Sequence, residues 1–493
     1  MNTNDFSNVK LVNSLDENIN AIKNIFVNDI TIIYRELFIG THTETRCMLI
    51  YIDGMANSQI INENIIKPIL LSEISHINGS TLTDILMQKI LLTGDNKKIT
   101  NVDDIINGII YGKTMLFIDG FAEVISMDTI GWQTRDISEP QSETIIRGPR
   151  EGFTESMNLN LSLLRRRVIN PNLKLKFITM GKQTKTQICV CYIEGIAQEL
   201  ILEELMKRLT NIDIDGILDS GYIEELIKDA PYSPFRTIIN TERPDVVAGK
   251  LLEGRFAVMC DGSPVVLTLP SIFVEVFQSN EDYYDNFIYS SFVRSLRFLC
   301  FFLGTSFSAV YVAIVTFHQE LIPTPLLIGL YSARKGAPFP SIVEAFGMMI
   351  VFEILREAGL RMPKHIGGAL TIVGTLVLGD AAVNARIVSA PIVIITSLTG
   401  LASIMLPQVL GIVVIRIIFL LLSSILGLYG YVLGVMALGL HMMSIRSFGI
   451  PYMLNVPAFS TQDVKDTVIR APWWSMSLRP KMFSKNKKRM KKK

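Results

Sequence analysis

The fold of this chain is decided by residues 298–317, which read FLCFFLGTSFSAVYVAIVTF and contain no charged side chain. At a rise of ~1.5 Å per residue, a helix of this length spans the ~30 Å of hydrocarbon in a bilayer. Two further apolar stretches follow, residues 387–406 and 411–440, and only Arg416 interrupts the second. The sequence therefore predicts a membrane domain in the second half of the chain.

The number of crossings follows from the charges at the two ends of the chain. Eight of the thirteen residues 481–493 are Lys or Arg, and the positive-inside rule places such a tail in the cytoplasm. The polar first 40 residues lack the basic and apolar regions of a cleaved signal peptide, so the N-terminus is expected on the same side. We predict an even number of crossings, four, with six as the alternative.

Two stretches leave that number open. Residues 411–440 are too long for one untilted span, so they either tilt strongly or fold back near Gly427–Tyr431. The short apolar segment 366–379 is expected to form a span, or part of one, together with the residues that follow it. The basic tail also suits nucleic acid, but beside a membrane domain we interpret it as topological, with Trp473 and Trp474 as an anchor in the lipid interface.

The first half of the chain repeats itself. Residues 51–57 (YIDGMAN) match residues 192–198 (YIEGIAQ), and residues 112–120 (GKTMLFIDG) match residues 254–262 (GRFAVMCDG). Two motifs that recur in the same order at nearly the same offset indicate duplicated α/β modules. The paired acids Asp119 and Asp261 suit either a ligand site or a turn; because Asp-Gly after a strand is ordinary turn chemistry, we favour the turn.

The predicted fold is an α/β cytoplasmic region of two duplicated modules followed by an all-α polytopic membrane domain. Short β-branched runs predict strands at Arg46–Ile52, Met115–Ile118, Leu173–Thr179 and Gln187–Ile193. Amphipathic stretches predict helices at Gln59–Leu71, Thr81–Leu92 and Gln198–Leu209. The expected boundaries are a polar N-terminal segment 1–44, the first module 45–145, a linker 146–170, the second module 171–285, the membrane domain 290–445 and a basic cytoplasmic tail 446–493.

No constellation of an enzyme or a metal site occurs in the sequence. HExxH, GxSxG and the Rossmann GxGxxG are absent, and the five histidines are scattered without metal-ligand spacing. Cys189 and Cys191 are predicted to lie on one face of a strand, where core thiols are more common than a metal site. We therefore expect no enzymatic activity, no cofactor and no metal.

Polar residues inside or beside the membrane are the candidates for function, because charges there tend to face a bundle interior or a water path. Glu353, Arg356 and Glu357 share one helix face; an amphipathic helix lying in the interface would explain them equally well. Arg416 is a further polar residue of this kind, and the alternative is that its side chain snorkels toward the interface. The candidate pore or gating residues are Glu344, Glu353, Asp380, Asn384 and Arg386.

Several ordered motifs resemble the A subunits of bacterial spore germinant receptors of the GerA type. They are Arg147–Glu155 (RGPREGFTE) with Asn160 and Arg165–Arg167, Asp261–Pro264 (DGSP) with Pro270, Pro338–Pro340 with Glu344, Glu357–Pro363, Gly379–Val383 with Ser389, and Arg470–Pro472 with Arg479–Pro480. The resemblance covers residues from about 45 to 480. One departure is Asp380, where the family motif has Gln; an ion pair between Asp380 and Arg386 would require the helix to break at Asn384.

The resemblance implies a membrane receptor subunit without enzymatic activity. Such subunits sit in the spore inner membrane with a transporter-like B subunit and a lipoprotein C subunit, form homo-oligomers, and convert nutrient sensing into ion release. The alternatives are a secondary transporter of a small solute and a non-conducting membrane scaffold. The segment Arg147, Gly148, Pro149, Arg150 and Glu151 is either an inter-module linker or a subunit contact, and no nucleic-acid partner is expected.

Overall fold

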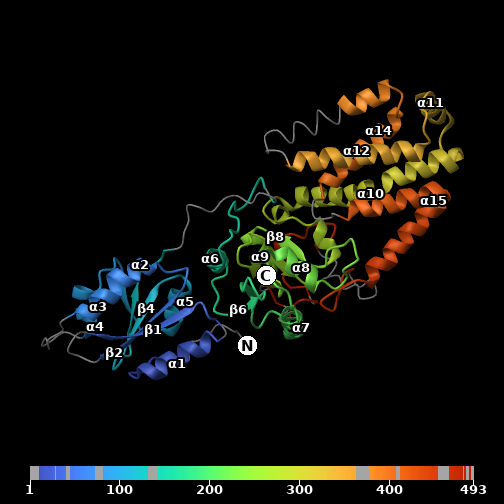
Figure 1. Ribbon diagram of the computed structural model, residues 1–493. Coiled ribbons are helices and arrows are strands. Elements are labelled where there is room, and N and C mark those ends of the chain that lie inside the picture. Colours follow the sequence, from blue (N-terminus) through green and yellow to red (C-terminus); the bar gives the residue numbers. More distant parts are fainter. Residues whose placement is uncertain are drawn as a thin grey trace. The chain divides into compact units, whose positions relative to one another are not determined.

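The computed structural model describes residues 10–27, 29–39, 45–72, 82–131, 143, 145–361, 377–406, 411–453, 466–480, 482–484 and 488–489 (Figure 1). The chain divides into two compact units. The repeat unit comprises residues 1–228, 238–270 and 477–493, and the helical unit comprises residues 229–237 and 271–476. The chain therefore leaves the repeat unit to build the helical unit and returns to the repeat unit at its C-terminal end.

The first module of the repeat unit is a five-stranded antiparallel sheet with the strand order β1-β2-β4-β5-β3. Its elements are α1 (Leu15–Ile25), β1 (Ile32–Ile39), β2 (Thr45–Ile52), α2 (Ser58–Ile60), α3 (Lys67–Leu71), α4 (Leu82–Ile85), β3 (Asn96–Ile99), α5 (Val102–Ile110), β4 (Thr114–Ile118) and β5 (Val124–Met127). A π-helical turn, Ile61–Ile66, connects α2 to α3, and another, Leu86–Ile90, extends α4.

The second module repeats this topology with the strand order β6-β7-β9-β10-β8. Its elements are α6 (Met157–Arg167), β6 (Leu173–Met180), β7 (Thr186–Ile193), α7 (Glu199–Thr210), α8 (Ser220–Ile227), β8 (Ile239–Thr241), α9 (Pro244–Leu252), β9 (Phe256–Cys260) and β10 (Val266–Leu269). The predicted duplication is thus present in three dimensions. Its bounds differ from the predicted ones, because α1 and β1 precede residue 45 and α6 lies inside the expected linker 146–170.

The paired acids Asp119 and Asp261 act as helix caps in the two modules. The backbone N–H of Leu15, at the start of α1, donates to Asp119 Oδ1 at 3.1 Å. The N–H of Met157, at the start of α6, donates to Asp261 Oδ1 at the same distance. A carboxylate that accepts the free N–H of a first helical turn is stabilising. This repeated capping supports the structural interpretation of the two acids.

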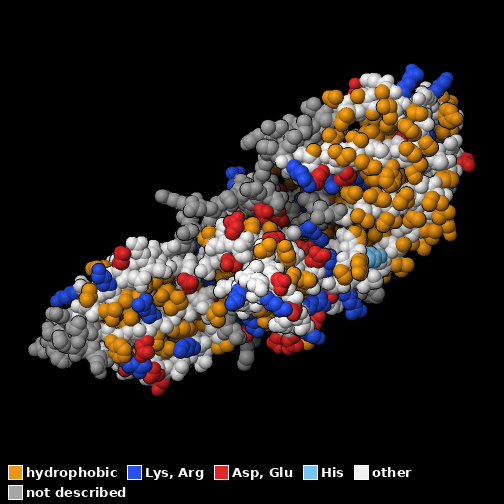
Figure 2. Space-filling view, viewed as in Figure 1, with side chains coloured by type: hydrophobic (Ala, Val, Ile, Leu, Met, Phe, Trp, Pro, Cys, Tyr) orange, Lys and Arg blue, Asp and Glu red, His pale blue; other side chains and the backbone are white. Residues whose placement is uncertain are grey.

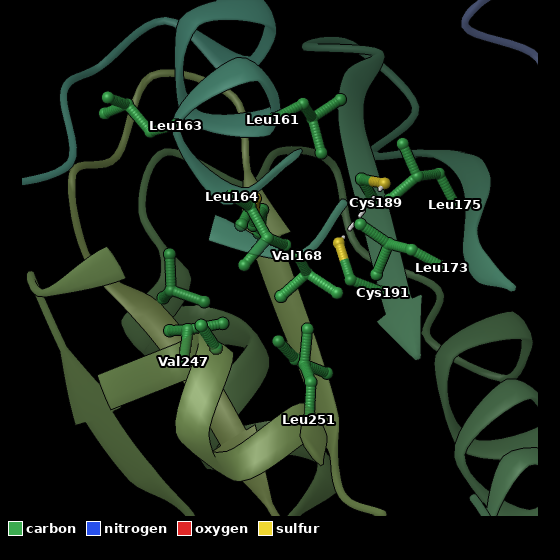
Figure 3. Close-up of a cluster of buried hydrophobic side chains, with 14 of the residues drawn as sticks. Leu161, Leu163, Leu164, Val168, Leu173, Leu175, Cys189, Cys191, Val247 and Leu251 are labelled. Carbon is green, nitrogen blue, oxygen red and sulfur yellow. Dashed lines mark hydrogen bonds between the residues drawn. The ribbon is translucent and has the colours of Figure 1, made fainter. Parts of the chain in front are cut away.

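The second module closes around an apolar core between α6, α9 and the sheet (Figure 3). Cys189 and Cys191 point into this core from β7, with their sulfur atoms 3.8 Å apart and no exposed surface. Burial raises the pKa of the Cys189 thiol well above its ordinary value. The two thiols therefore behave as apolar core residues.

A buried ion pair joins the two modules within the repeat unit. Arg165 on α6 pairs with Asp29, which precedes β1, and their side chains are 1% and 0% exposed. The Arg165 guanidinium also donates to Thr31 Oγ1 at 3.0 Å, and Asp29 forms a parallel bridge with Leu175 of β6. Because removing one partner leaves an uncompensated buried charge, such a pair opposes separation of the modules.

The helical unit is built from α10 (Phe287–Phe317), α11 (Thr324–Arg334), α12 (Ser341–Arg361), α14 (Ala390–Ile404) and α15 (Ile412–Ser444). Short elements complete it: the 3-10 turns Phe273–Phe277, Asn280–Tyr283, Gln319–Leu321 and Trp473–Ser475, and the strands β11 (Arg446–Ser447) and β12 (Ile450–Pro451). Among the described residues, α10 and α15 are long and apolar enough to cross a bilayer, with mean hydropathies of 2.1 and 2.5 over their most apolar windows. The predicted segment 366–379 lies largely outside the described residues.

Hydrophobic side chains cover much of the visible surface of the helical unit (Figure 2). The large hydrophobic residues of this unit that are more than half exposed include Leu326, Ile328 and Tyr331 on α11, Ile394 and Leu401 on α14, and Ile425 on α15. An apolar surface of this extent is costly in water and marks a membrane or protein contact. It agrees with the predicted membrane domain.

The long helix α15 folds back on itself at Gly427. This residue has φ 62° and ψ −145°, which is not helical. The rings of Phe419 and Tyr431 meet at 5.6 Å, whereas twelve residues of straight helix would separate them by ~18 Å. Of the two predicted arrangements for residues 411–440, the structure adopts the fold-back, and α15 is a helical hairpin.

Candidate functional site

Arg416, on the first arm of the α15 hairpin, is the centre of a buried polar junction. Its Nε donates to the carbonyl oxygen of Gly304 on α10 at 2.7 Å, and its Nη2 donates to Ser403 Oγ on α14. Only 2% of Arg416 is exposed. Of the two alternatives considered for Arg416, the side chain turns inward and ties α15 to two neighbouring helices instead of snorkelling to the interface.

Glu353 on α12 supplies the negative charge of this junction. Its Oε1 lies 3.7 Å from Arg416 Nη1, and its Oε2 lies 2.6 Å from Arg356 Nη2. Two guanidinium groups thus share one carboxylate, at the meeting point of α10, α12, α14 and α15. In contrast, Glu357 pairs with Arg361 at 2.7 Å in an exposed position.

Glu344, in the first turn of α12, forms a second buried contact between α12 and α14. Its Oε2 accepts hydrogen bonds from the backbone N–H of Ser389 at 2.9 Å and from Ser389 Oγ at 2.6 Å. Its Oε1 is buried and finds no hydrogen-bond partner among the described residues. Since a carboxylate oxygen without a partner is unfavourable inside a protein, this atom is available to accept a hydrogen bond from water or to contact a cation.

Hydroxyl groups line the α10–α14 contact between these two acids. Ser308 and Thr399 lie 3.1 Å apart through their hydroxyl oxygens, and both residues are buried. Thr396, Thr399 and Ser403 each also donate to a carbonyl one turn earlier in α14. The inner face of the bundle therefore carries a row of dipoles that reorient by side-chain rotation alone.

The other candidate residues lie apart from this junction. Asp380 accepts a hydrogen bond from Asn384 Nδ2 at 3.0 Å, and both residues are exposed. Arg386 is exposed and left-handed, with φ 58°. The ion pair considered for Asp380 and Arg386 does not form, although the helix over residues 377–384 does end at Asn384.

Sequence reasoning missed a charged cluster at the start of α10. Arg294, completely buried, contacts Asp282 Oδ2 at 3.1 Å and Asp466 Oδ1 at 2.7 Å. Arg297 Nη1 contacts the same Asp282 oxygen at 2.9 Å, and Tyr283 donates to Asp466 at 2.5 Å. The decisive partner, Asp466, is too distant in sequence for any local pattern to reveal it.

The segment Arg147–Glu151 is held by contacts inside the repeat unit. Glu151 pairs with Arg167 at 2.7 Å and with Arg166 at 3.4 Å, both in the last turn of α6. The carbonyl oxygen of Pro149 accepts from Arg243 Nη2 at 2.9 Å, and Gly148 has φ 141°. These contacts support a linker role, while Arg147 and Arg150 stay exposed.

Comparison with known proteins identifies the family. The family described as Bacillus/Clostridium GerA spore germination protein matches residues 20–482. This chain belongs to the GerA family. Within it, the chain is 44% identical to spore germination protein KA of Bacillus subtilis over 96% of this chain and 88% of that protein. It is 36% identical to spore germination protein GerLA of Bacillus cereus over 92% of each chain.

The chain is also similar to a second Bacillus subtilis protein and to a solved structure. An uncharacterized membrane protein of Bacillus subtilis, YfkQ, is 43% identical over 89% of this chain and 85% of its own length. The crystal structure of the N-terminal domain of the A subunit of the Bacillus megaterium spore germinant receptor GerK3 is 34% identical. It covers 54% of this chain and 98% of its own, with a TM-score of 0.43.

Proposed function

We propose that this GerA-family chain is the A subunit of a nutrient-germinant receptor in the spore inner membrane. In this proposal it works with a transporter-like B subunit and a lipoprotein C subunit, with both termini in the cytoplasm. Several copies assemble so that their helical units conduct ions once a nutrient is sensed. Family membership over residues 20–482 and the apolar surface of the helical unit support this assignment.

The buried polar junction of the helical unit is the observation that favours conduction over a passive anchor. Charged side chains within membrane segments are costly and usually face the interior of a bundle or a water-filled path. Glu344 and Arg416 are both 2% exposed, inside a bundle whose outer surface is apolar. An anchor has no use for such groups, whereas a cation path needs carboxylates and hydroxyls that replace water around the ion.

Asp380, Asn384 and Arg386 remain proposed as residues of the pore entrance, because they are exposed beside the segment that leads to α14. In the same proposal, Asp380 alters ion preference relative to family members with Gln at that position. Arg147 and Arg150 remain proposed as subunit contacts, because both side chains are exposed on the surface.

The test is nutrient-triggered potassium release from spores that make this chain with its partner subunits. Glu344→Gln and Glu353→Gln remove the two buried negative charges and preserve side-chain volume. Glu357→Gln is the matched control, because Glu357 lies on the same helix but is exposed. Receptor levels are measured by immunoblot of spore membranes.

We expect both buried variants to slow potassium release by about tenfold or more while nutrient binding by the complex persists, and the control to behave like wild type. A tenfold effect corresponds to about 1.4 kcal/mol, within reach of a single charge in a low-dielectric path. Normal release from both buried variants would assign these acids a structural role and favour a non-conducting scaffold.

A further inference from the structure

The second module of the repeat unit is completed by the end of the chain. Ser484, in the C-terminal tail, forms an antiparallel bridge with Ala197, just before α7, and the side-chain amide of Gln198 donates to the carbonyl oxygen of Met482 at 2.9 Å. Phe483 is 1% exposed and lies under the guanidinium of Arg255, 4.0 Å from its carbon to the ring centre. We call this binding surface, formed by Ala197, Gln198, Gly254 and Arg255, the tail slot.

The first module has the same slot, filled by a different part of the chain. Ile130 forms an antiparallel bridge with Ala56, which corresponds to Ala197 in the repeat. The N–H of Asn57 donates to the carbonyl oxygen of Thr129 at 2.8 Å, and the N–H of Gly131 donates to that of Met55 at 3.1 Å. Here the segment 129–131 simply continues from β5.

The difference arises where the chain leaves the second module. The residue equivalent to Thr129 is Ser271, with which the helical unit begins, and its N–H donates to Ser447 Oγ at 3.2 Å. The slot next to β10 is therefore vacant until the tail returns. The helical unit is an insertion between β10 and the segment that completes its module.

A glycine with a positive φ lies at the equivalent position of both slots. Gly254 has φ 98°, and a Cβ placed on it would lie 2.7 Å from the carbonyl oxygen of Phe483. Gly112, its counterpart, has φ 94° and would meet the carbonyl oxygen of Met55 at 2.9 Å. The positive φ favours glycine at both positions, and at Gly254 the backbone of the bound segment also leaves no room for a Cβ.

We propose that the tail slot is the attachment point through which the C-terminal end of the helical unit is linked to the second module, and that the link is needed for signalling. Its partner is the described segment Met482, Phe483 and Ser484 of the same chain, which carries one buried phenyl ring. Arg479 supports the attachment by donating from Nε to the carbonyl oxygen of Leu252 at 2.7 Å. The role in signalling rests on the proposed function, because it is measured as potassium release. The attachment of the tail to the slot does not depend on that function.

The test combines disruption and covalent repair in the complete receptor. Phe483→Asp places a charge in the slot, and Phe483→Leu is the apolar control. The pair Ala197→Cys and Ser484→Cys provides a disulfide, because residues paired in an antiparallel bridge have Cα atoms ~4.5–5.5 Å apart. The five native cysteines are buried, so they do not compete for the introduced thiols.

The disulfide is expected to form in spore membranes treated with a mild oxidant, as a mobility shift that a reductant reverses. Phe483→Asp is expected to lower nutrient-triggered potassium release by about tenfold or more, since a buried phenyl ring contributes at least that factor to docking. Adding the cysteine pair to Phe483→Asp restores release under oxidising conditions. Phe483→Leu stays close to wild type.

Three results would overturn the proposal: no disulfide between positions 197 and 484, normal release from Phe483→Asp, or loss of release that the disulfide does not restore. Failure of the proposed function has a different signature. In that case the unaltered receptor releases no potassium in response to nutrient, while formation of the disulfide still reports the attachment.

Discussion

The carboxyl group of Glu143 lies against β8, where it accepts a hydrogen bond from Thr241 Oγ1 at 2.6 Å. Burial raises the pKa of Glu143 above its ordinary value of 4.5, although the hydrogen bond from Thr241 and the charge of Arg243 oppose this effect. The native state therefore binds this proton more tightly than the unfolded chain does. Its contribution to stability is complete below pH 4.5 and is lost as the pH rises through the raised pKa.

Glu143→Gln, which imitates the protonated acid, is expected to raise the unfolding temperature of the repeat unit at neutral pH. It should also flatten the dependence of that temperature on pH above 4.5. The measurement is thermal unfolding of the full chain in detergent between about pH 4 and pH 8. Glu203→Gln, at an exposed position of α7, serves as the control. Equal pH profiles for Glu143→Gln and wild type would refute the linkage.

Single residues show what the sequence could and could not reveal about the candidate site. Glu344 and Glu353 were predicted as functional because a carboxylate in an apolar membrane segment is costly unless it has a partner. Both form buried contacts in the structure. The partners of Arg416 were not predicted, because Gly304 and Ser403 are neutral residues on other helices. Local sequence patterns reveal the cost of a buried charge, but not the distant groups that satisfy it.

At the scale of elements, Gly427 determines whether α15 is a rod or a hairpin. Its φ and ψ of 62° and −145° lie near a region almost reserved for glycine, and a Cβ there would meet His318 Cε1 at 2.8 Å. Gly427→Ala is expected to destabilise the helical unit by about 1–3 kcal/mol. Thermal unfolding in detergent and receptor level in membranes measure this effect.

Gly439→Ala is the matched control on the second arm of the same hairpin. No atom lies within 4 Å of a Cβ placed on Gly439, and the residue is helical. Alanine is favoured over glycine in a helix by about 1 kcal/mol, so this variant should be neutral or slightly more stable. If both variants behaved alike, the turn at Gly427 would have no special requirement for glycine.

The predicted strands match β2, β4, β6 and β7 closely, because each is a β-branched run that is buried on pairing. The prediction missed α1 and β1, which lie in the segment 1–44 assigned as polar. That segment is polar in composition, but Leu15, Ile19 and Ile22 form one buried stripe of α1. An amphipathic helix of 11 residues does not show in a composition that is averaged over 44 residues.

At the scale of the whole molecule, the contacts of the helical unit define the direction of each helix. Ile412 packs near Gly304 and Gly427 near Phe317, so the first arm of α15 runs in the direction of α10. On α14, Ile392 packs in the cluster of Val312, whereas Ser403 reaches Gly304, so α14 runs in the opposite direction. The second arm of α15 returns toward the start of α10, where Met442 shares a cluster with Phe301.

These directions predict that α11 and the end of α15 face opposite sides of the membrane. Ser332→Cys, exposed on α11, should react in intact cells with a maleimide that cannot cross membranes. Ser444→Cys, exposed at the end of α15, should react only after permeabilisation. The native cysteines are buried, so they are not expected to react with the maleimide. Reaction of both sites in intact cells would require a different topology.

The vacant place beside β10 also has a consequence for biosynthesis. Roughly 210 residues separate Leu269 from Met482, and a ribosome adds about 5–20 residues per second. The first module is finished as soon as Gly131 emerges, but the second waits about 10–40 s while the translocation machinery inserts the helices. During that interval the tail slot of the nascent chain is unfilled, and it is filled only when residues 482–484 have been translated.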